Sequence, residues 1–197
     1  MAAMIERAEL HKTIWRIAND LRGSVDGWDF KSYVLGFLFY RFISEKLTDY
    51  VNASEREGIL SEGGTPEEAA AFDYATLSDE EAESDRENIV REKGFFIRPS
   101  DLFGNVRARA AADENLNETL AYVFRFIENS ARGSGSESDL RGLFDDVDVN
   151  STKLGNTVAK RNTKLVKIMD AVGDVPLEHG AAQIDAFGDA YEYLVTM

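Results

Sequence analysis

The 197-residue chain contains no cysteine and only two histidines, His11 and His179. The absence of cysteine excludes disulfide bonds, thiolate zinc sites and cysteine nucleophiles, and it agrees with a reducing compartment. Two histidines supply little for metal ligation or for acid–base catalysis by imidazole. We therefore expect no catalytic residue, no cofactor-binding residue and no metal site within this chain.

The chain also lacks an apolar run long enough to cross a membrane. The longest run, Tyr33–Ile43, covers 11 residues and includes Arg41, whereas a membrane-spanning helix needs about 20 apolar residues. The N-terminus has no apolar core of the length found in signal peptides, so secretion is not indicated. We expect a cytoplasmic protein with no membrane contact.

Positive charge is scarce, with 22 Lys and Arg residues against 36 Asp and Glu residues and a net charge of −14. Residues 53–92 hold three basic and thirteen acidic side chains, and residues 170–197 hold no basic and six acidic ones. A chain with this balance cannot coat a polyanion with its whole surface. Nucleic acid could therefore be bound only by a local basic patch.

One segment, residues 153–169, contains basic side chains and no acidic one. Its lysines Lys160, Lys164 and Lys167 follow an i, i+4, i+7 spacing that places them on one face of a helix, with Lys153 and Arg161 near its margins. Cations in this arrangement can follow the phosphates of a duplex without reading its sequence. The alternative is a solvated face, or one that meets an acidic partner.

The spacing of apolar residues predicts an all-α fold, a bundle of several helices around one central apolar helix. That helix begins near Asp26 or Asp29 and ends near Val51, and its cluster of aromatic residues is typical of core packing rather than of base stacking. At most one very short β element is expected, at Phe95–Ile97. The other helices are predicted at about residues 10–21, 115–131, 154–173 and 184–195.

The segments between these helices carry signals for turns and caps. The acidic stretch 53–92 reads as a peripheral excursion with short helices, one of them starting at Thr65-Pro66-Glu67-Glu68. Ser100-Asp101 is predicted to cap a brief helix, and Gly133–Ser136 to form a flexible break before a short helix near 138–144. Residues 146–150 resemble the start of a calcium loop, but the later ligand positions are missing.

Residues 19–44 read NDLRGSVDGWDFKSYVLGFLFYRFIS. This stretch resembles the N-terminal helical domain of the modification subunit of type I restriction-modification systems. In that family the modification subunit is the adenine-N6 DNA methyltransferase. The resemblance continues at Leu154-Gly155-Asn156-Thr157, at Arg161-Asn162 and at residues 186–194. It implies that residues 1–174 form the helical domain and that residues 175–197 lead into a catalytic domain, so we expect the natural chain to continue.

In that family the full-length subunit uses S-adenosylmethionine and works on double-stranded DNA with a specificity subunit, a second modification subunit and restriction subunits. Its catalytic domain carries an Asn-Pro-Pro-Phe/Tyr motif, whereas Pro66, Pro99 and Pro176 are the prolines here and no two are adjacent. We therefore expect an assembly and DNA-clamping domain that is inactive alone. The alternative is a self-contained acidic helical module that binds proteins and has no role with DNA.

Overall fold

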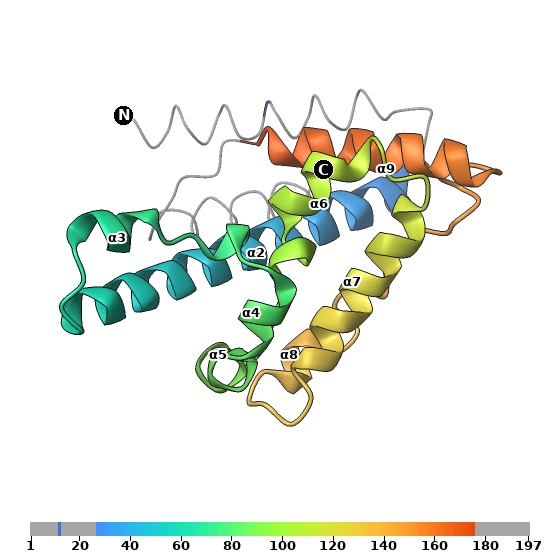
Figure 1. Cartoon of the computed structure of the whole chain (residues 1–197). Coiled ribbons are helices and arrows are strands. Elements are labelled where there is room, and N and C mark those ends of the chain that lie inside the picture. Colours follow the sequence, from blue (N-terminus) through green and yellow to red (C-terminus); the bar gives the residue numbers. More distant parts are fainter. Residues whose placement is uncertain (1–11, 13–26, 176–197) are drawn as a thin grey trace. The chain divides into compact units, whose positions relative to one another are not determined.

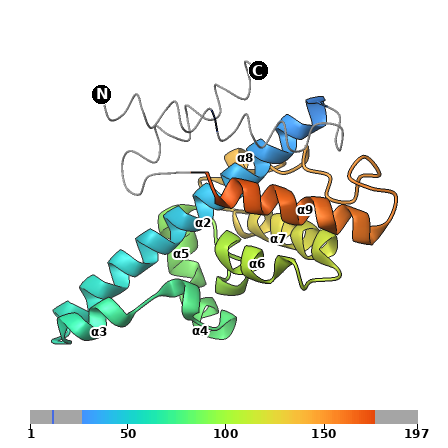
Figure 2. The same ribbon diagram turned by 90° about the horizontal axis from the view of Figure 1, so that it is seen from above.

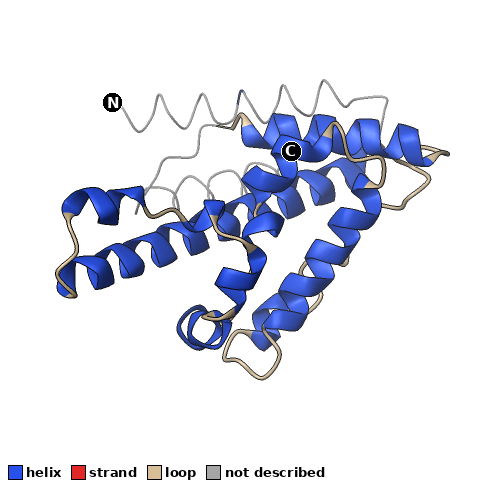
Figure 3. Cartoon of the chain, viewed as in Figure 1, coloured by secondary structure: helices blue, strands red, loops and turns tan. Residues whose placement is uncertain are grey.

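The computed structural model describes Lys12 and residues 27–175. These residues form helices, turns and loops and include no strand, as Figure 3 shows, which confirms the predicted all-α class. The helices predicted at 10–21 and 184–195 lie outside the described residues, apart from Lys12. The elements, in chain order (Figure 1), are α2 (Gly27–Ser61), α3 (Pro66–Ala71), the 3₁₀ turn η1 (Tyr74–Thr76), α4 (Asp79–Glu83), α5 (Arg86–Lys93), the 3₁₀ turn η2 (Pro99–Asp101), α6 (Phe103–Ala110), α7 (Leu116–Ser130), α8 (Glu137–Leu140) and α9 (Val158–Gly173).

The chain divides into two compact units. Among the described residues, unit 1 contains Lys12 and residues 27–40, 110–120 and 144–175, and unit 2 contains residues 41–109 and 121–143. Helices α2 and α7 each contribute residues to both units. No helix in the described part of the chain is both long enough and apolar enough to cross a membrane.

The core of unit 1 is built on the first part of α2. Val34, Phe37, Leu38 and Tyr40 are fully buried there, as predicted for a central apolar helix. Helix α9 adds a second apolar stripe, whose spacing of three and four residues matches the helical period. The fully buried members of that stripe are Leu165, Ile168, Met169 and Val172.

Unit 2 contains the remainder of α2, which continues to Ser61 and so ends ten residues beyond the predicted Val51. The extension forms because residues 52–61 contain no proline and are rich in good helix formers. Two residues beyond the end of the helix, Gly63 has a positive φ of 91°, and the Gly64 N–H donates to the Ile59 oxygen at 2.8 Å. A glycine with positive φ, followed by a backbone bond to a carbonyl five residues earlier, is a common way for a helix to end.

The acidic stretch 53–92 forms the short helices that the sequence predicts. Thr65 and Glu68 form a capping box at the start of α3, and the Ser78–Glu81 pair does the same for α4. Helix α3 lies beside the C-terminal end of α2 in both views (Figures 1 and 2), where Arg56 Nη2 donates to the Phe72 oxygen at 2.8 Å. Reciprocal capping thus organises a stretch that buries few side chains of its own.

Two loops of unit 2 are held by side chains. The extended segment around Phe96 has no partner strand in the described structure, and its Phe96 N–H donates to Ser130 Oγ at 2.8 Å. Ser134 Oγ donates to the Gly94 oxygen at 2.7 Å, and the Gly133 N–H donates to Glu137 Oε2 at 2.8 Å. The glycine–serine segment is therefore a hydrogen-bonded turn, where the sequence suggested a flexible break.

Candidate nucleic-acid interface

The basic segment, residues 153–169, forms the loop before α9 and the first twelve residues of that helix. Thr157 is the N-cap residue, and its Oγ1 accepts a hydrogen bond from the Lys160 N–H at 3.3 Å. Leu154 is fully buried and anchors the preceding loop. Val158 was expected in the buried stripe but is 41% exposed, because the first turn of α9 borders an open groove that Ala110 and Ala111 also line.

The structure separates the five predicted contact residues into two groups. Lys153, Lys160 and Lys167 are exposed, and the half-buried Lys164 reaches the loop, with Nζ donating to the Lys153 oxygen at 3.5 Å. Arg161 is half-buried, and its Nη1 donates to the Gly155 oxygen at 3.1 Å. We call the four lysines the basic face and treat Arg161 separately, because its Nε is also buried without a hydrogen-bond partner among the described residues.

The charges on α9 oppose its helix dipole. Its first turn contains no acidic residue and its last turn no basic one, whereas Lys160 and Arg161 lie near the start and Asp170 and Asp174 near the end. Helix termini prefer the opposite signs by roughly 0.3–1 kcal/mol for each charge. This arrangement costs stability, so Lys160, the lysine of the first turn, is not explained by the needs of the helix.

The capping residues of other helices sharpen this contrast. In α3 and α4 the third helical residue is a glutamate, Glu68 or Glu81, whose side chain bonds back to the cap. The equivalent position after Thr157 in α9 is Lys160. The chain thus completes the favourable capping pair at two short helices and places a cation at the same position of its longer basic helix.

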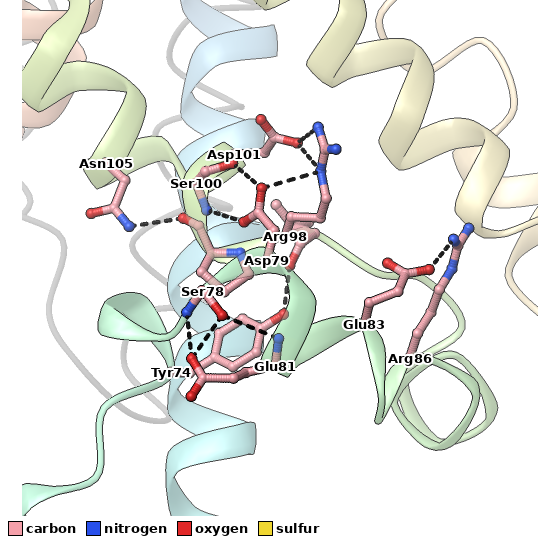
Figure 4. Close-up of polar contacts among 12 residues, drawn as sticks. Tyr74, Ser78, Asp79, Glu81, Glu83, Arg86, Arg98, Ser100, Asp101 and Asn105 are labelled. Carbon is pink, nitrogen blue, oxygen red and sulfur yellow. Dashed lines mark hydrogen bonds and ion pairs between the residues drawn. The ribbon is translucent and has the colours of Figure 1, made fainter.

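In unit 2, the ionised side chains of Arg98, Asp101 and Asp79 form a cluster that holds the chain in place (Figure 4). Arg98 Nε donates to Asp101 Oδ2 at 2.7 Å, and Asp79 accepts bonds from the Ser100 N–H at 2.9 Å and the Ser100 hydroxyl at 2.6 Å. Burial raises the pKa of Asp101, and the neighbouring Arg98 counteracts that rise. Ser100 and Asp101 therefore join η2 to α4 and to Arg98, and their predicted role as a helix cap stays a prediction.

Among residues 27–175 and Lys12, no group of three or more His, Asp or Glu side chains is placed to hold a metal ion. The carboxylates of the unit 2 cluster are occupied by the arginine and by Ser100, as described above. The described surface thus offers cations for binding an anion, and residues 153–169 carry five of them with no acidic residue between them in the sequence.

Comparison with known proteins identifies the family. The protein-family model described as the HsdM N-terminal domain matches residues 10–172 of this chain. The chain belongs to the HsdM N-terminal domain family. It is 43% identical over 200 residues to the type I restriction enzyme MpnII methylase subunit of Mycoplasma pneumoniae, an alignment that covers 98% of this chain and 35% of that protein.

A solved structure supports the same relationship. The crystal structure of the methyltransferase subunit of a type I restriction-modification system from Streptococcus thermophilus superposes with a TM-score of 0.72 at 31% identity. The match covers 96% of this chain and 38% of the other. This HsdM domain thus spans less than half the length of both relatives.

In the HsdM domain, asparagines that sequence reasoning did not single out as functional support the basic face. Asn162 is 7% exposed, accepts the Asn117 N–H at 3.1 Å through Oδ1, and donates to the Glu114 oxygen at 2.7 Å. Asn117 Nδ2 in turn donates to Asn150 Oδ1 at 2.5 Å. The one sequence signal for Asn162 was its place in the Arg161-Asn162 pair that resembles the family. That pair marks the position but does not show what the asparagine does.

Proposed function

We propose that this HsdM N-terminal domain binds double-stranded DNA through the basic face, Lys153, Lys160, Lys164 and Lys167. The observation that carries the proposal is the charge of α9, where cations occupy the N-terminal half against the dipole and no acid occurs from residue 153 to 169. Lysine is a flexible point charge suited to phosphate oxygens. The face therefore holds the DNA backbone and leaves sequence recognition to another part of the enzyme.

The whole protein, in this proposal, is an S-adenosylmethionine-dependent adenine-N6 methyltransferase that acts in the cytoplasm. It works with a specificity subunit, a second modification subunit and restriction subunits, and the present domain closes around DNA in that assembly. Support comes from the family and from relatives named as methylase and methyltransferase subunits. The chain covers only 35% of the first of these, so the role assigned to this domain is assembly and DNA contact.

The glycine-rich turn at 133–136 does not fit a phosphate-binding loop. The glycine-rich turn at 133–136 follows helix α7 rather than a strand, and its Gly133 N–H is already bonded to Glu137. A phosphate-binding loop instead follows a strand and leaves its N–H groups for the ligand. Because the chain also lacks the adjacent prolines of an Asn-Pro-Pro-Phe/Tyr motif, we place no step of methyl transfer in this domain and expect the chain alone to be inactive.

The salt dependence of DNA affinity tests the basic face. We compare the assembled enzyme with a triple variant, Lys160→Gln, Lys164→Gln and Lys167→Gln, on a duplex over a range of salt concentrations. Each lost phosphate contact lowers the slope of log K against log salt by about 0.9, so the expected decrease is about 2.7 for three contacts. A matched triple variant of exposed arginines in unit 2, Arg91→Gln, Arg125→Gln and Arg132→Gln, should keep the slope. An unchanged slope in the lysine variant would overturn the assignment.

A further inference from the structure

We propose that Gly155 and Arg161 are positioning residues that hold Lys153 beside α9, so that loop and helix contact DNA phosphates together. The inference rests on the DNA-binding role proposed above. It assigns to Arg161 a task different from that of the lysines around it. The evidence is the geometry of the loop at residues 150–157.

Arg161 is turned toward the loop. Its Nη1 donates to the Gly155 oxygen at 3.1 Å, and its Nε is buried without a hydrogen-bond partner among the described residues. Burying a polar group without a partner costs free energy, roughly 1–3 kcal/mol. Arg161 keeps its Nε buried while Nη1 is bonded to Gly155. This is expected of a side chain that is fixed by the loop, and not of one that extends to a phosphate.

Gly155 is required for the close approach of the loop to the helix. A Cβ atom at this position would lie 2.6 Å from the Lys160 Cβ and 3.0 Å from the Arg161 nitrogen. Both distances are shorter than ordinary van der Waals contact between these atoms. Any larger residue would therefore push the loop away from the first turn of α9.

Further contacts fix the backbone on both sides of Lys153. The Lys153 N–H donates to Ser151 Oγ at 3.3 Å, and its oxygen accepts from Lys164 Nζ at 3.5 Å. Upstream, the Tyr33 hydroxyl donates to the Asp148 oxygen at 2.6 Å. The backbone of Lys153 is thus held while its side chain is exposed. A cation presented on a fixed backbone loses less entropy when it binds.

Gly155→Ala tests the inference without changing any charge. In the assembled enzyme we expect duplex affinity to fall roughly fivefold, the effect of one exposed ionic contact. The slope of log K against log salt should fall by about 0.9, since Lys153 no longer reaches its phosphate. Gly104→Ala is the matched control, because a Cβ there meets nothing within 4 Å, and it should leave both quantities unchanged.

A double-mutant cycle separates positioning from direct contact. Arg161→Gln and Lys153→Gln should each weaken binding, and the double variant should bind no more weakly than either single variant, because both remove the same contact. Additive losses, with the slope falling by about 1.8, would show that Arg161 binds a phosphate itself and would overturn the inference. The melting temperature and helical circular dichroism of each variant establish that it is folded, and either Gly155→Ala or Arg161→Gln is sufficient if the other unfolds.

The outcomes also separate this inference from the proposed function. Unchanged affinity in Gly155→Ala and Arg161→Gln, with loss of affinity in the triple lysine variant, would overturn the positioning role and leave DNA binding by α9 intact. If the triple lysine variant also binds normally, the proposed function itself fails.

Discussion

The hydroxyl of Tyr74 donates a hydrogen bond to the backbone oxygen of Ile97 at 2.7 Å. Tyr74 belongs to the acidic stretch 53–92 and is only 1% exposed, and its N–H donates to Asn52 Oδ1 at 2.7 Å. The bond to Ile97 supplies a partner for a carbonyl group in a segment that has no partner strand in the described structure. A neutral buried side chain thus fixes the most highly charged part of the molecule.

Tyr74→Phe should destabilise the domain by about 1–3 kcal/mol. The substitution keeps the ring in place but leaves the buried Ile97 oxygen without this donor, and an unsatisfied buried acceptor carries that cost. The free energy of unfolding in urea gives the measurement. Tyr122→Phe is the control in the same unit, because Tyr122 is 47% exposed and water replaces its hydroxyl contacts. Equal effects of the two substitutions would contradict this account.

The same tyrosine predicts a pH dependence. Burial, reinforced by Asp79, Glu83 and Asp85, raises the pKa of Tyr74 above its ordinary value of 10.0. A raised pKa favours the neutral phenol in the folded state, so its stabilising effect is complete below pH 10 and declines as the unfolded state ionises above it. The stability difference between the parent and Tyr74→Phe should therefore shrink from pH 10 to 11. A difference that stays constant over this interval would refute the prediction.

Two glycines of helix α2 should respond to alanine in opposite directions. A Cβ at Gly36 would lie 2.2 Å from Val147 Cγ2, whereas a Cβ at Gly58 meets nothing within 4 Å. Gly36→Ala should cost about 1–3 kcal/mol through overpacking. Gly58→Ala should add about 0.4–1 kcal/mol, since alanine is the better helix former. Thermal unfolding of both variants provides the measurement, and a stabilising Gly36→Ala would contradict the packing seen at Val147.

The helices of this domain could be predicted from periodicity where one face is buried. Leu116, Leu120 and Ile127 of α7 follow the predicted stripe and are all fully buried. The end of α2 was missed because Ala53 to Ser61 has no apolar stripe of its own, and its stop depends on the backbone conformation of Gly63. Periodicity reports burial, so it does not locate the end of an exposed helix.

The basic face could be predicted as a set of cations, but the separate role of Arg161 could not. Sequence spacing places Arg161 one residue from Lys160 and gives both the same charge. Only the fold shows that the Arg161 side chain is bonded to Gly155. Likewise, Asp101 was taken for a cap residue because its partner, Arg98, lies in an irregular segment whose path the sequence does not define.

Removing the arginine of this pair should expose the cost of a buried charge. In Arg98→Met, Asp101, which is only 4% exposed, loses the arginine that is bonded to it, and breaking a buried ion pair in this way costs about 3–5 kcal/mol. Arg86→Met is the matched control. Like Arg98, Arg86 lies over the Phe126 ring, but its ion-pair partner, Glu83, is exposed. Unfolding free energies at pH 7 should show a loss below about 1 kcal/mol for the control.

Acidification should partly rescue Arg98→Met. Burial already raises the pKa of Asp101, and loss of Arg98 removes the main group that opposes this rise, leaving the weaker effect of Arg109. A carboxyl with a raised pKa in the folded state is less destabilising once protonated, so the penalty should decrease as the pH falls from 7 to 5. A penalty that stays constant over this range would show that the lost interaction is packing on the rings and not the ion pair.

Lys160→Glu should make the domain more stable and its DNA binding weaker. Glutamate three residues after the Thr157 cap completes a capping box of the kind present at Thr65 and Ser78, and it reverses an unfavourable charge near the N-terminus of α9. The expected gain is about 0.5–1 kcal/mol in the free energy of unfolding. The same change removes one cation from the basic face and adds an anion, so duplex affinity should fall.

Two further variants separate the cap from the charge. Lys160→Gln also completes the capping pair but only neutralises the site, so it should show part of the gain in stability and a smaller loss of affinity. Thr163→Glu places the anion on an exposed position one turn later, where it should weaken DNA binding with little effect on stability, because the dipole effect declines beyond the first turn. If Lys160→Glu lowers stability, or leaves DNA affinity unchanged, then Lys160 is a structural residue, and its position against the helix dipole does not reflect a binding function.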